Sequence, residues 1–278
     1  MSLTVRVKRI QQLLEDEHEL LLDQAIAEQL CAPKYQDSKK LNRYEHKVFS
    51  QSGEDGIIAE IFKRIGTRNR LFVECSPGNG LESNTLHLLT QGWTGLWIEA
   101  EPRIVRDLKT SFSKMIERGA LSVRQQLVTT ENFEPLLDEA SLPLDFDLLA
   151  IDIDRNDYWV WQRVQRYHPC VVVIEYNAIF PPGSDWVVED AQHEVWDRTS
   201  NAGASLTALE KLAVEKGYKL VGCTLAGTNA FFVRDDMAGD HFLAPFTAEN
   251  HYEPPRYYLT SRQAGHRRGV PTGAKRSE

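Results

Sequence analysis

Acidic and amide side chains stand at the ends of two strand-like runs, where they could act as bases or as metal ligands. Asp152 and Asp154 lie at the end of the run FDLLAIDI, and Glu175 and Asn177 lie at the end of CVVVIEY. The two residues of each pair are two positions apart, so their side chains point to the same side of an extended chain. Neighbouring parallel strands are about 4.8 Å apart, so we expect these four oxygen-bearing side chains to converge.

Three roles for this group are open. Asp152, Glu175 and Asn177 could bind Mg²⁺, an ion that prefers oxygen ligands and lowers the pKa of a bound hydroxyl. The side chains could instead contact a substrate directly, with Asp152, Asp154 or Glu175 as the catalytic base. The third role is structural, because Asp154, Asn156 and Asp157 could simply cap a helix that begins at residue 157.

Two histidines and an arginine are further candidates for chemistry. His193 lies in the irregular stretch 178–203, where it could act as a base, although a loop histidine is more often only solvated. His87 lies in a predicted helix, where a packing role is the stronger interpretation. Arg155 could bind an acidic substrate group through two hydrogen bonds, or pair with a nearby aspartate. Four tryptophans could wall an apolar pocket or pack in the core: Trp159, Trp161, Trp186 and Trp196. For Trp161, core packing is the favoured interpretation.

A strand that ends in an acidic residue runs into a loop with two glycines, in FVECSPGNGLESNT (72–85). Ligands of open α/β sheets bind beyond the carboxyl ends of the strands, where Glu74, Gly78 and Gly80 would lie. Glu99 ends the next strand about twenty residues further on, the spacing at which a carboxylate accepts hydrogen bonds from both ribose hydroxyls. The GxGxxG pattern of pyrophosphate-binding loops is absent, so an NAD-dependent enzyme is the weakest hypothesis. An adenosine ligand without a pyrophosphate fits better, and S-adenosylmethionine is such a ligand.

The elements that position these residues alternate between strands and helices. Strands are predicted at 71–75, 94–100, 121–128, 146–153, 170–176, 218–224 and 229–234. Helices are predicted at 53–65, 83–91, 102–117, 132–139, 157–166 and 204–216. Several strands are continuous apolar runs, as expected for strands that are covered on both faces. This pattern predicts an α/β fold with a doubly wound, mostly parallel sheet. The last two strands are joined by a few residues around Gly227, too few for a helical crossover, so they form an antiparallel hairpin.

The chain divides into three parts. Residues 1–45 form a helical extension, because apolar residues recur at helical spacing over 5–31 beside charged ones. This amphipathic helix either caps the main domain or pairs two subunits into a homodimer. Residues 46–240 form the α/β domain, and residues 241–278 form an irregular tail with a basic cluster.

Composition excludes several classes of partner. The net charge of −8 argues against nucleic acid, since phosphate binding requires clustered Lys and Arg. No run of 18 apolar residues and no apolar leader segment occur, so we expect neither secretion nor a membrane partner. The four cysteines are far apart, and three lie in strand-like runs, which favours reduced thiols and a cytoplasmic location.

Six segments carry a resemblance to a known family. They are FSQSGEDGII (49–58), LESNTLHL (81–88), GWTGLWIEAEP (92–102), IDIDRNDYWVW (151–161), VVVIEYNAIFPPGS (171–184) and GASLTALEKLAVEKGYKLVGC (203–223). In this order they resemble class I S-adenosylmethionine-dependent methyltransferases of the FkbM-like group, in particular uncharacterised bacterial members with SQxGED and DIDGNDYW motifs. The resemblance covers about residues 46–236 and does not specify a substrate.

The resemblance implies a Rossmann-like core of seven strands with an antiparallel last strand. It also implies that Glu74 and the loop of Gly78 and Gly80 face the methionine part of the cofactor, and that Glu99 binds the ribose. Three further residues match motif positions near the cofactor: Gln51, Glu54 and Asn84. The chain departs from the family pattern at Ser76, which stands at a glycine-like place, at Asn79, where an acid is frequent, and at Arg155, which replaces the glycine of DIDGND.

These observations predict a methyltransferase that uses S-adenosylmethionine, with Mg²⁺ as an additional candidate. The family resemblance favours an oxygen acceptor on a small molecule or saccharide, and a nitrogen acceptor remains open. The competing hypothesis is a catalytically inactive protein that keeps the fold as a scaffold or sensor. The departures at Ser76 and Arg155 favour it, and the acids at successive strand ends oppose it.

Overall fold

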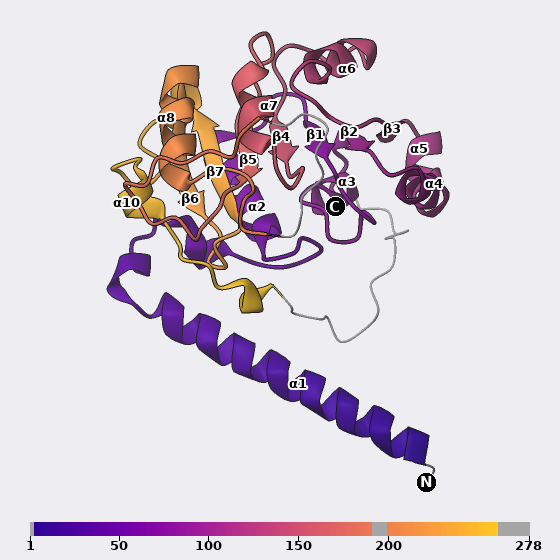
Figure 1. The fold of residues 1–278 in the computed structure, drawn as a ribbon, viewed down its shortest axis with the longest axis vertical. Coiled ribbons are helices and arrows are strands. Elements are labelled where there is room, and N and C mark those ends of the chain that lie inside the picture. Colours follow the sequence, from indigo (N-terminus) through magenta and orange to yellow (C-terminus); the bar gives the residue numbers. More distant parts are fainter. Residues whose placement is uncertain (1–2, 191–198, 261–278) are drawn as a thin grey trace, which may run out of the picture.

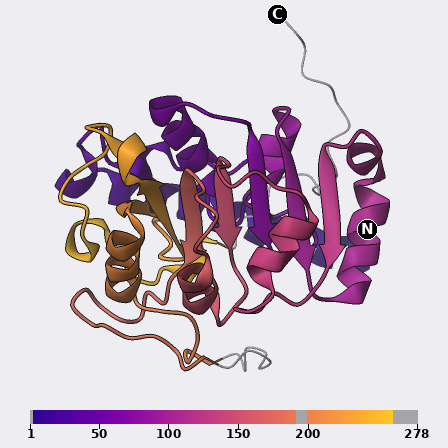
Figure 2. The ribbon, with the colours of Figure 1, turned by 90° about the horizontal axis from the view of Figure 1, so that it is seen from above.

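A computed structural model of the protein describes residues 3–190 and 199–260. A central sheet is covered by helices on both faces, and a long N-terminal helix runs beside this body (Figures 1 and 2). The strands are β1 (Leu71–Cys75), β2 (Thr94–Glu99), β3 (Leu121–Gln125), β4 (Leu148–Ile151), β5 (Val171–Glu175), β6 (Tyr218–Cys223) and β7 (Asn229–Arg234). All seven predicted strands are confirmed, and the structure ends some of them up to three residues earlier.

The sheet has the order β3-β2-β1-β4-β5-β7-β6. Strands β1 to β5 pair in parallel, whereas β7 is antiparallel to both β5 and β6. The predicted hairpin is therefore confirmed, and it is inserted so that β7 lies next to β5. The order reverses direction between β1 and β4, the kind of switch point at which open α/β sheets bind ligands.

Most predicted helices are also present. They are α2 (Glu54–Ile65), α3 (Leu86–Thr90), α4 (Pro102–Ser111), α5 (Ser113–Glu117), α6 (Phe133–Glu139), α7 (Asp157–Arg163) and α8 (Leu206–Lys216). The helix predicted at 102–117 is divided at Phe112, whose buried ring packs edge-on against Trp97. The helix predicted from 83 begins only at Leu86, because Glu74 binds the backbone before it.

Apolar side chains fill the space on both faces of the sheet. In β1, Phe72 packs into the cluster on one face and Val73 and Cys75 into the cluster on the other. This two-sided burial explains why the strand sequences read as continuous apolar runs. Cys75, Cys170 and Cys223 are buried free thiols, as expected, and Cys31 is exposed.

The chain ends add elements around the β6 edge of the sheet. The long helix α1 (Leu3–Leu30) confirms the predicted helical extension, and the turns η1 (Pro33–Tyr35) and η2 (Leu41–Tyr44) follow it. The C-terminal elements are α9 (Asp235–Ala238), α10 (Ala248–His251) and η3 (Tyr257–Leu259). Within the described part of the chain, none of the helices combines the length and apolar character that a membrane span needs.

A buried ionic group fastens these two chain ends together. Glu253 is fully buried, and it accepts hydrogen bonds from Lys34 at 3.1 Å, from Tyr35 at 2.7 Å and from Arg256 at 3.0 Å. Tyr176, just beyond β5, donates to the Glu253 carbonyl at 2.6 Å. The residues that follow α1 and the described start of the predicted tail are therefore packed parts of the main body.

Candidate active site

Two adjoining cavities open at the carboxyl ends of β1, β4 and β5. The first, here called the loop cavity, has a volume of about 170 Å³ and is lined by the β1–α3 loop. Its lining includes Gln51, Glu74, Ser76, Gly78, Asn84, Asp152 and Asn229. The second, here called the acid cavity, has a volume of about 430 Å³. Its lining includes Gln51, Asp154, Glu175, Asn177, Thr228 and Tyr257. Gln51 lines both cavities, so they meet at this side chain.

Glu74 holds the loop of the first cavity in place. One carboxylate oxygen accepts a hydrogen bond from the Asn84 backbone at 2.8 Å, and the other accepts from the Thr85 hydroxyl. Thr85 in turn accepts from the Trp97 indole at 2.8 Å, which connects the loop to β2. Burial raises the pKa of the Glu74 carboxyl to about 7. Glu74 thus both positions the loop and lines the cavity.

The loop turns through three residues with positive φ. Ser76 has a φ of 54°, Gly78 of 56° and Gly80 of 76°. A serine in this left-handed region is strained, whereas glycine is not. The two glycines differ in their surroundings: a Cβ on Gly80 would lie 2.8 Å from the Phe112 ring, whereas one on Gly78 would meet nothing within 4 Å. Gly80 therefore allows close packing, and Gly78 leaves space at the cavity wall.

Two of the motif residues predicted near the cofactor lie in different surroundings. Gln51 lines both cavities. Glu54 is fully buried, and its carboxylate accepts hydrogen bonds from the Ser52 backbone at 2.7 Å and from the Asn229 side chain at 2.9 Å. Glu54 therefore supports the cavity wall by holding Asn229, which itself lines the loop cavity.

Glu99 lies at the end of β2, in register with Gln125 of β3. It is buried, and one of its oxygens accepts a hydrogen bond from the Glu101 backbone at 3.0 Å. Glu99 does not line either of the two cavities. The neighbouring Ser76 backbone donates to the Ile98 carbonyl at 2.8 Å, so the β1 loop begins directly beside the end of β2.

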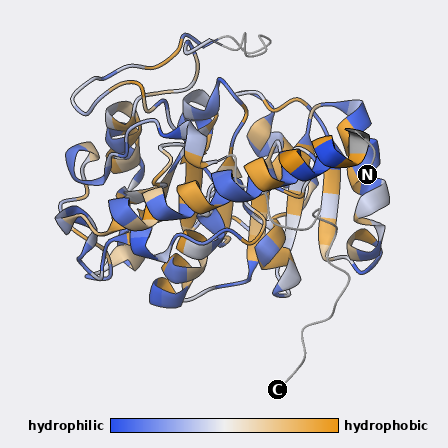
Figure 3. Ribbon diagram, turned by 90° about the horizontal axis from the view of Figure 1, so that it is seen from below, coloured by the Kyte–Doolittle hydropathy of each residue, from blue (hydrophilic) through white to orange (hydrophobic). Residues whose placement is uncertain are grey.

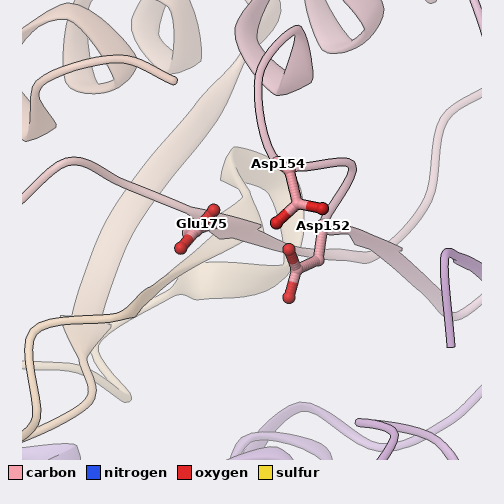
Figure 4. Close-up of side chains that lie close together, drawn as sticks. All are labelled: Asp152, Asp154 and Glu175. Carbon is pink, nitrogen blue, oxygen red and sulfur yellow. The ribbon is translucent and has the colours of Figure 1, made fainter. Parts of the chain in front are cut away.

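The predicted convergence is confirmed for the three carboxylates of the group. Asp152 and Asp154 follow β4 and Glu175 ends β5, and each offers a carboxylate oxygen within 4.8 Å of the other two (Figure 4). Burial, followed by the nearby acids, raises the pKa values of Asp152 and Glu175 well above their usual range. Partial burial also raises the pKa of Asp154. A cation held between these oxygens would relieve the repulsion.

The side chain of Asn177, a predicted metal ligand, makes hydrogen bonds to neighbouring loop backbone. Its amide nitrogen donates to the carbonyls of Ser200 at 2.8 Å and Ala202 at 2.9 Å, and its oxygen accepts from the Ile179 backbone at 3.3 Å. Its side chain thus holds the loop that walls the acid cavity. The third carboxylate of the acid cluster belongs to Asp154, which has a φ of 66° and lies beside Asp152 (Figure 4).

The structure departs from the helix-capping role that the sequence suggests for Asp154, Asn156 and Asp157. Asn156 precedes α7 but makes no side-chain capping bond. The buried Asp157 accepts a hydrogen bond from the Ile153 backbone at 2.8 Å, and burial raises its pKa to about 6. Asp157 therefore fixes the backbone turn that carries Asp154.

The remaining candidates fall outside the two cavities or outside the described residues. His193 and Trp196 lie in the segment 191–198, which the structure does not describe. His87 on α3 shares a hydrogen bond of 2.7 Å with Gln91, the residue after α3, in agreement with a packing role. Trp161 is buried in the core, as favoured, and Trp159 donates to the Val188 carbonyl at 2.8 Å. Trp186 stacks on Phe180.

Sequence reasoning missed the contribution of the β6–β7 hairpin and of the C-terminal segment. Thr228 and Asn229 line the cavities from the hairpin, and Tyr257 lines the acid cavity from η3. A polar pair at the start of the apolar strand NAFFVR was the available signal for the first two. No sequence signal indicated Tyr257, because the chain order does not reveal that η3 lies near the end of β5.

Comparisons with known proteins find no matching family model and no matching curated protein. Among solved structures, the N-terminal domain of EvdMO1 in the presence of SAH and D-fucose matches with 13% identity and a TM-score of 0.42, over 65% of this chain and 80% of that one. Magnesium protoporphyrin IX methyltransferase from Synechocystis PCC 6803 with bound SAH matches with 12% identity and a TM-score of 0.42, over 66% and 82%. An S-adenosylmethionine-dependent methyltransferase from Clostridium acetobutylicum ATCC 824 matches with 11% identity and a TM-score of 0.42, over 69% and 94%.

Proposed function

We propose that this protein is an S-adenosylmethionine-dependent methyltransferase of the FkbM-like group that its motifs resemble. One observation carries the proposal: the loop cavity and the acid cavity meet at Gln51, and the Asp152–Asp154–Glu175 cluster spans both. Asp152 lines the loop cavity, whereas Asp154 and Glu175 line the acid cavity. A methyl donor in the first cavity and an acceptor in the second would face each other across this cluster.

In this proposal the β1–α3 loop and Glu99 hold the cofactor, which supplies the methyl carbon when bound. Glu74 fixes the loop through Asn84 and Thr85. Gly78 leaves room beside the backbone. Glu99 would accept hydrogen bonds from the ribose hydroxyls, since its bond to the Glu101 backbone engages only one of its two carboxylate oxygens.

The acid cavity would bind the acceptor and remove its proton. A volume of about 430 Å³ suits a small molecule or a monosaccharide. Among the described residues that line it, none is Lys, Arg or His, which disfavours phosphorylated or carboxylated acceptors. A hydroxyl placed between Asp154 and Glu175 could transfer its proton to a carboxylate whose raised pKa makes it a stronger base. O-methylation is therefore the reaction that we propose.

The cluster can also hold a divalent cation. Asp152, Asp154 and Glu175 offer three carboxylate oxygens, the ligand type that Mg²⁺ prefers. A bound ion would lower the pKa of an acceptor hydroxyl. The direct and the metal-assisted reactions use the same three residues and differ in their dependence on the ion.

Transfer of a labelled methyl group tests the proposal. The full chain is incubated with methyl-labelled S-adenosylmethionine and a panel of sugars, polyols and amines, with Mg²⁺ or with a chelator. We expect label in a neutral hydroxyl compound, and we expect Asp152→Asn to lower transfer at least tenfold while cofactor affinity stays within about threefold. Equal transfer by Asp152→Asn would remove Asp152 from the site. Cofactor binding without transfer to any panel class would favour the scaffold or sensor hypothesis.

A further inference from the structure

Helix α1 has two apolar stripes, and one of them packs against the described part of the body. Leu22, Ile26 and Leu30 belong to a cluster with Tyr35, Leu225 and Leu259. Among the described residues, apolar packing against the body involves only this C-terminal third of the 28-residue helix. The rest of α1 extends beside the body (Figure 1).

The second stripe is exposed. Its members are large apolar residues that are between 54% and 61% exposed: Val7, Ile10, Leu13, Leu14, Leu20 and Leu21. In Figure 3, hydrophobic residues, in orange, recur along the length of α1 between hydrophilic ones, in blue. Their positions follow the three- and four-residue steps of a helix-pairing seam.

The exposed stripe points away from the body. Ile10 and Ile26 are sixteen residues apart, which at 3.6 residues per turn places them about 160° apart around the helix axis. Leu14 and Leu30 have the same separation. Because Ile26 and Leu30 face the body, rotation of α1 to cover the second stripe would expose the first. The described body therefore cannot cover both stripes at once.

The charges of α1 are divided along its length. Residues 3–13 carry three basic side chains, Arg6, Lys8 and Arg9, and no acidic one. Residues 14–28 carry six acidic side chains and no Lys or Arg: Glu15, Asp16, Glu17, Glu19, Asp23 and Glu28. This distribution opposes the helix dipole, which favours acids near the N-terminus and bases near the C-terminus. The sequence of α1 is therefore unfavourable for an isolated helix.

We propose that the exposed stripe binds α1 of a second copy of this chain in an antiparallel pair. The stripe is centred on Leu14, so antiparallel pairing places Val7 of each helix beside Leu21 of the other. It also places the basic N-terminal half of each helix beside the acidic half of its partner. A parallel pair would instead set like charges against each other. The contact is self-complementary and has twofold symmetry, as homodimer interfaces require.

Two other occupants fit this surface less well. An anionic membrane would repel the six acidic residues of 14–28. The remaining C-terminal residues, 261–278, offer only Ala264, Val270 and Ala274 beside one proline as apolar partners. Neither provides an apolar surface of matching length together with charges of matching order.

Sedimentation equilibrium of the full chain tests the pairing. We expect a mass twice the chain mass of 31.7 kDa at micromolar concentration. Leu14→Glu should raise the dissociation constant about 100-fold or more, because pairing would bury two carboxylates. The matched control is Val5→Glu, which also places a charge at an exposed apolar residue of α1 but about 180° from Leu14 around the axis. It should leave the dissociation constant within about threefold.

Disulfide cross-linking tests the orientation, in a background with the exposed Cys31 changed to serine. We expect Val7→Cys with Leu21→Cys to give a covalent dimer, and Val7→Cys alone to give none. Cross-linking by Val7→Cys alone would overturn the antiparallel arrangement. A wild-type monomer, or equal weakening by Leu14→Glu and Val5→Glu, would overturn the dimer. A monomer that sediments with phosphatidylserine vesicles would assign the stripe to lipid instead.

Discussion

Ser76→Gly tests whether the β1–α3 loop holds strain at its first residue. Ser76 has a φ of 54°, in the left-handed region. An L-residue in that region costs about 1–2 kcal/mol relative to right-handed backbone. Glycine removes this cost but loses about 0.5–1 kcal/mol through the greater freedom of the unfolded chain. We therefore expect the free energy of unfolding to rise by about 0.5–1 kcal/mol, with a rise in Tm of about 1–4 °C.

Ser141→Gly is the matched control. Ser141 also has a φ of 54°, but it is exposed and follows α6, away from both cavities. Chemical denaturation should give similar stabilisation for both variants, because the backbone cause is the same. Cofactor affinity should stay within about threefold of wild type in both.

Two results would refute this reasoning. A loss of stability in Ser76→Gly beside a gain in Ser141→Gly would mean that the Ser76 side chain contributes more than its backbone strain costs. If wild type failed to bind the cofactor and Ser76→Gly bound it, the serine would close the loop, and the scaffold hypothesis would replace the enzyme.

The other predictions concern Glu99, Glu74 and Glu253. Glu99→Ala should abolish cofactor binding in a calorimetric titration, whereas Glu101→Ala, which removes only the α4 cap, should not. Unchanged cofactor affinity in Glu99→Ala would contradict the proposal that Glu99 binds the ribose. Burial raises the pKa of Glu74 from 4.5 to about 7, so its contribution to stability is fully present below pH 4.5 and is lost as the pH rises to about 7. From pH 4.5 to pH 7 the free energy of unfolding should fall by about 3 kcal/mol more in wild type than in Glu74→Gln. The same pH dependence of stability in both proteins would contradict the raised pKa of Glu74. Glu253→Gln should lower the free energy of unfolding by about 3 kcal/mol, because it leaves buried donors without their carboxylate. If chemical denaturation shows a loss of stability below about 1 kcal/mol, water has taken over the hydrogen bonds of the carboxylate.

The fold could be read from the sequence because its strands are long apolar runs at regular spacing. Strands such as β1, β4 and β5 are buried on both faces, so nearly every residue of the run contributes to the pattern, whereas the edge strand β3 alternates buried and exposed residues. The short turn at Gly227 correctly predicted the antiparallel hairpin. The late start of α3 at Leu86 could not be read, since it depends on a hydrogen bond from Asn84 to Glu74 across ten residues.

The candidate site was predictable where side chains follow strands and unpredictable where loops return from a distance. Asp152, Asp154 and Glu175 converge because adjacent parallel strands end at the same edge. The use of Asn177 as a loop anchor depends on the carbonyls of Ser200 and Ala202, whose position the sequence does not reveal. The packed role of residues 33–44 was missed for the same reason, because the partner of Tyr35 is Glu253, more than 200 positions away.

The central claim is that the loop cavity binds S-adenosylmethionine beside the acid cluster. The most direct measurement is calorimetric titration of the full chain with S-adenosylmethionine and with S-adenosylhomocysteine, each with and without Mg²⁺. We predict micromolar binding of both at one site per chain, with Mg²⁺ changing the result if the acid cluster holds the ion. The absence of binding for both ligands, with and without Mg²⁺, would contradict the claim.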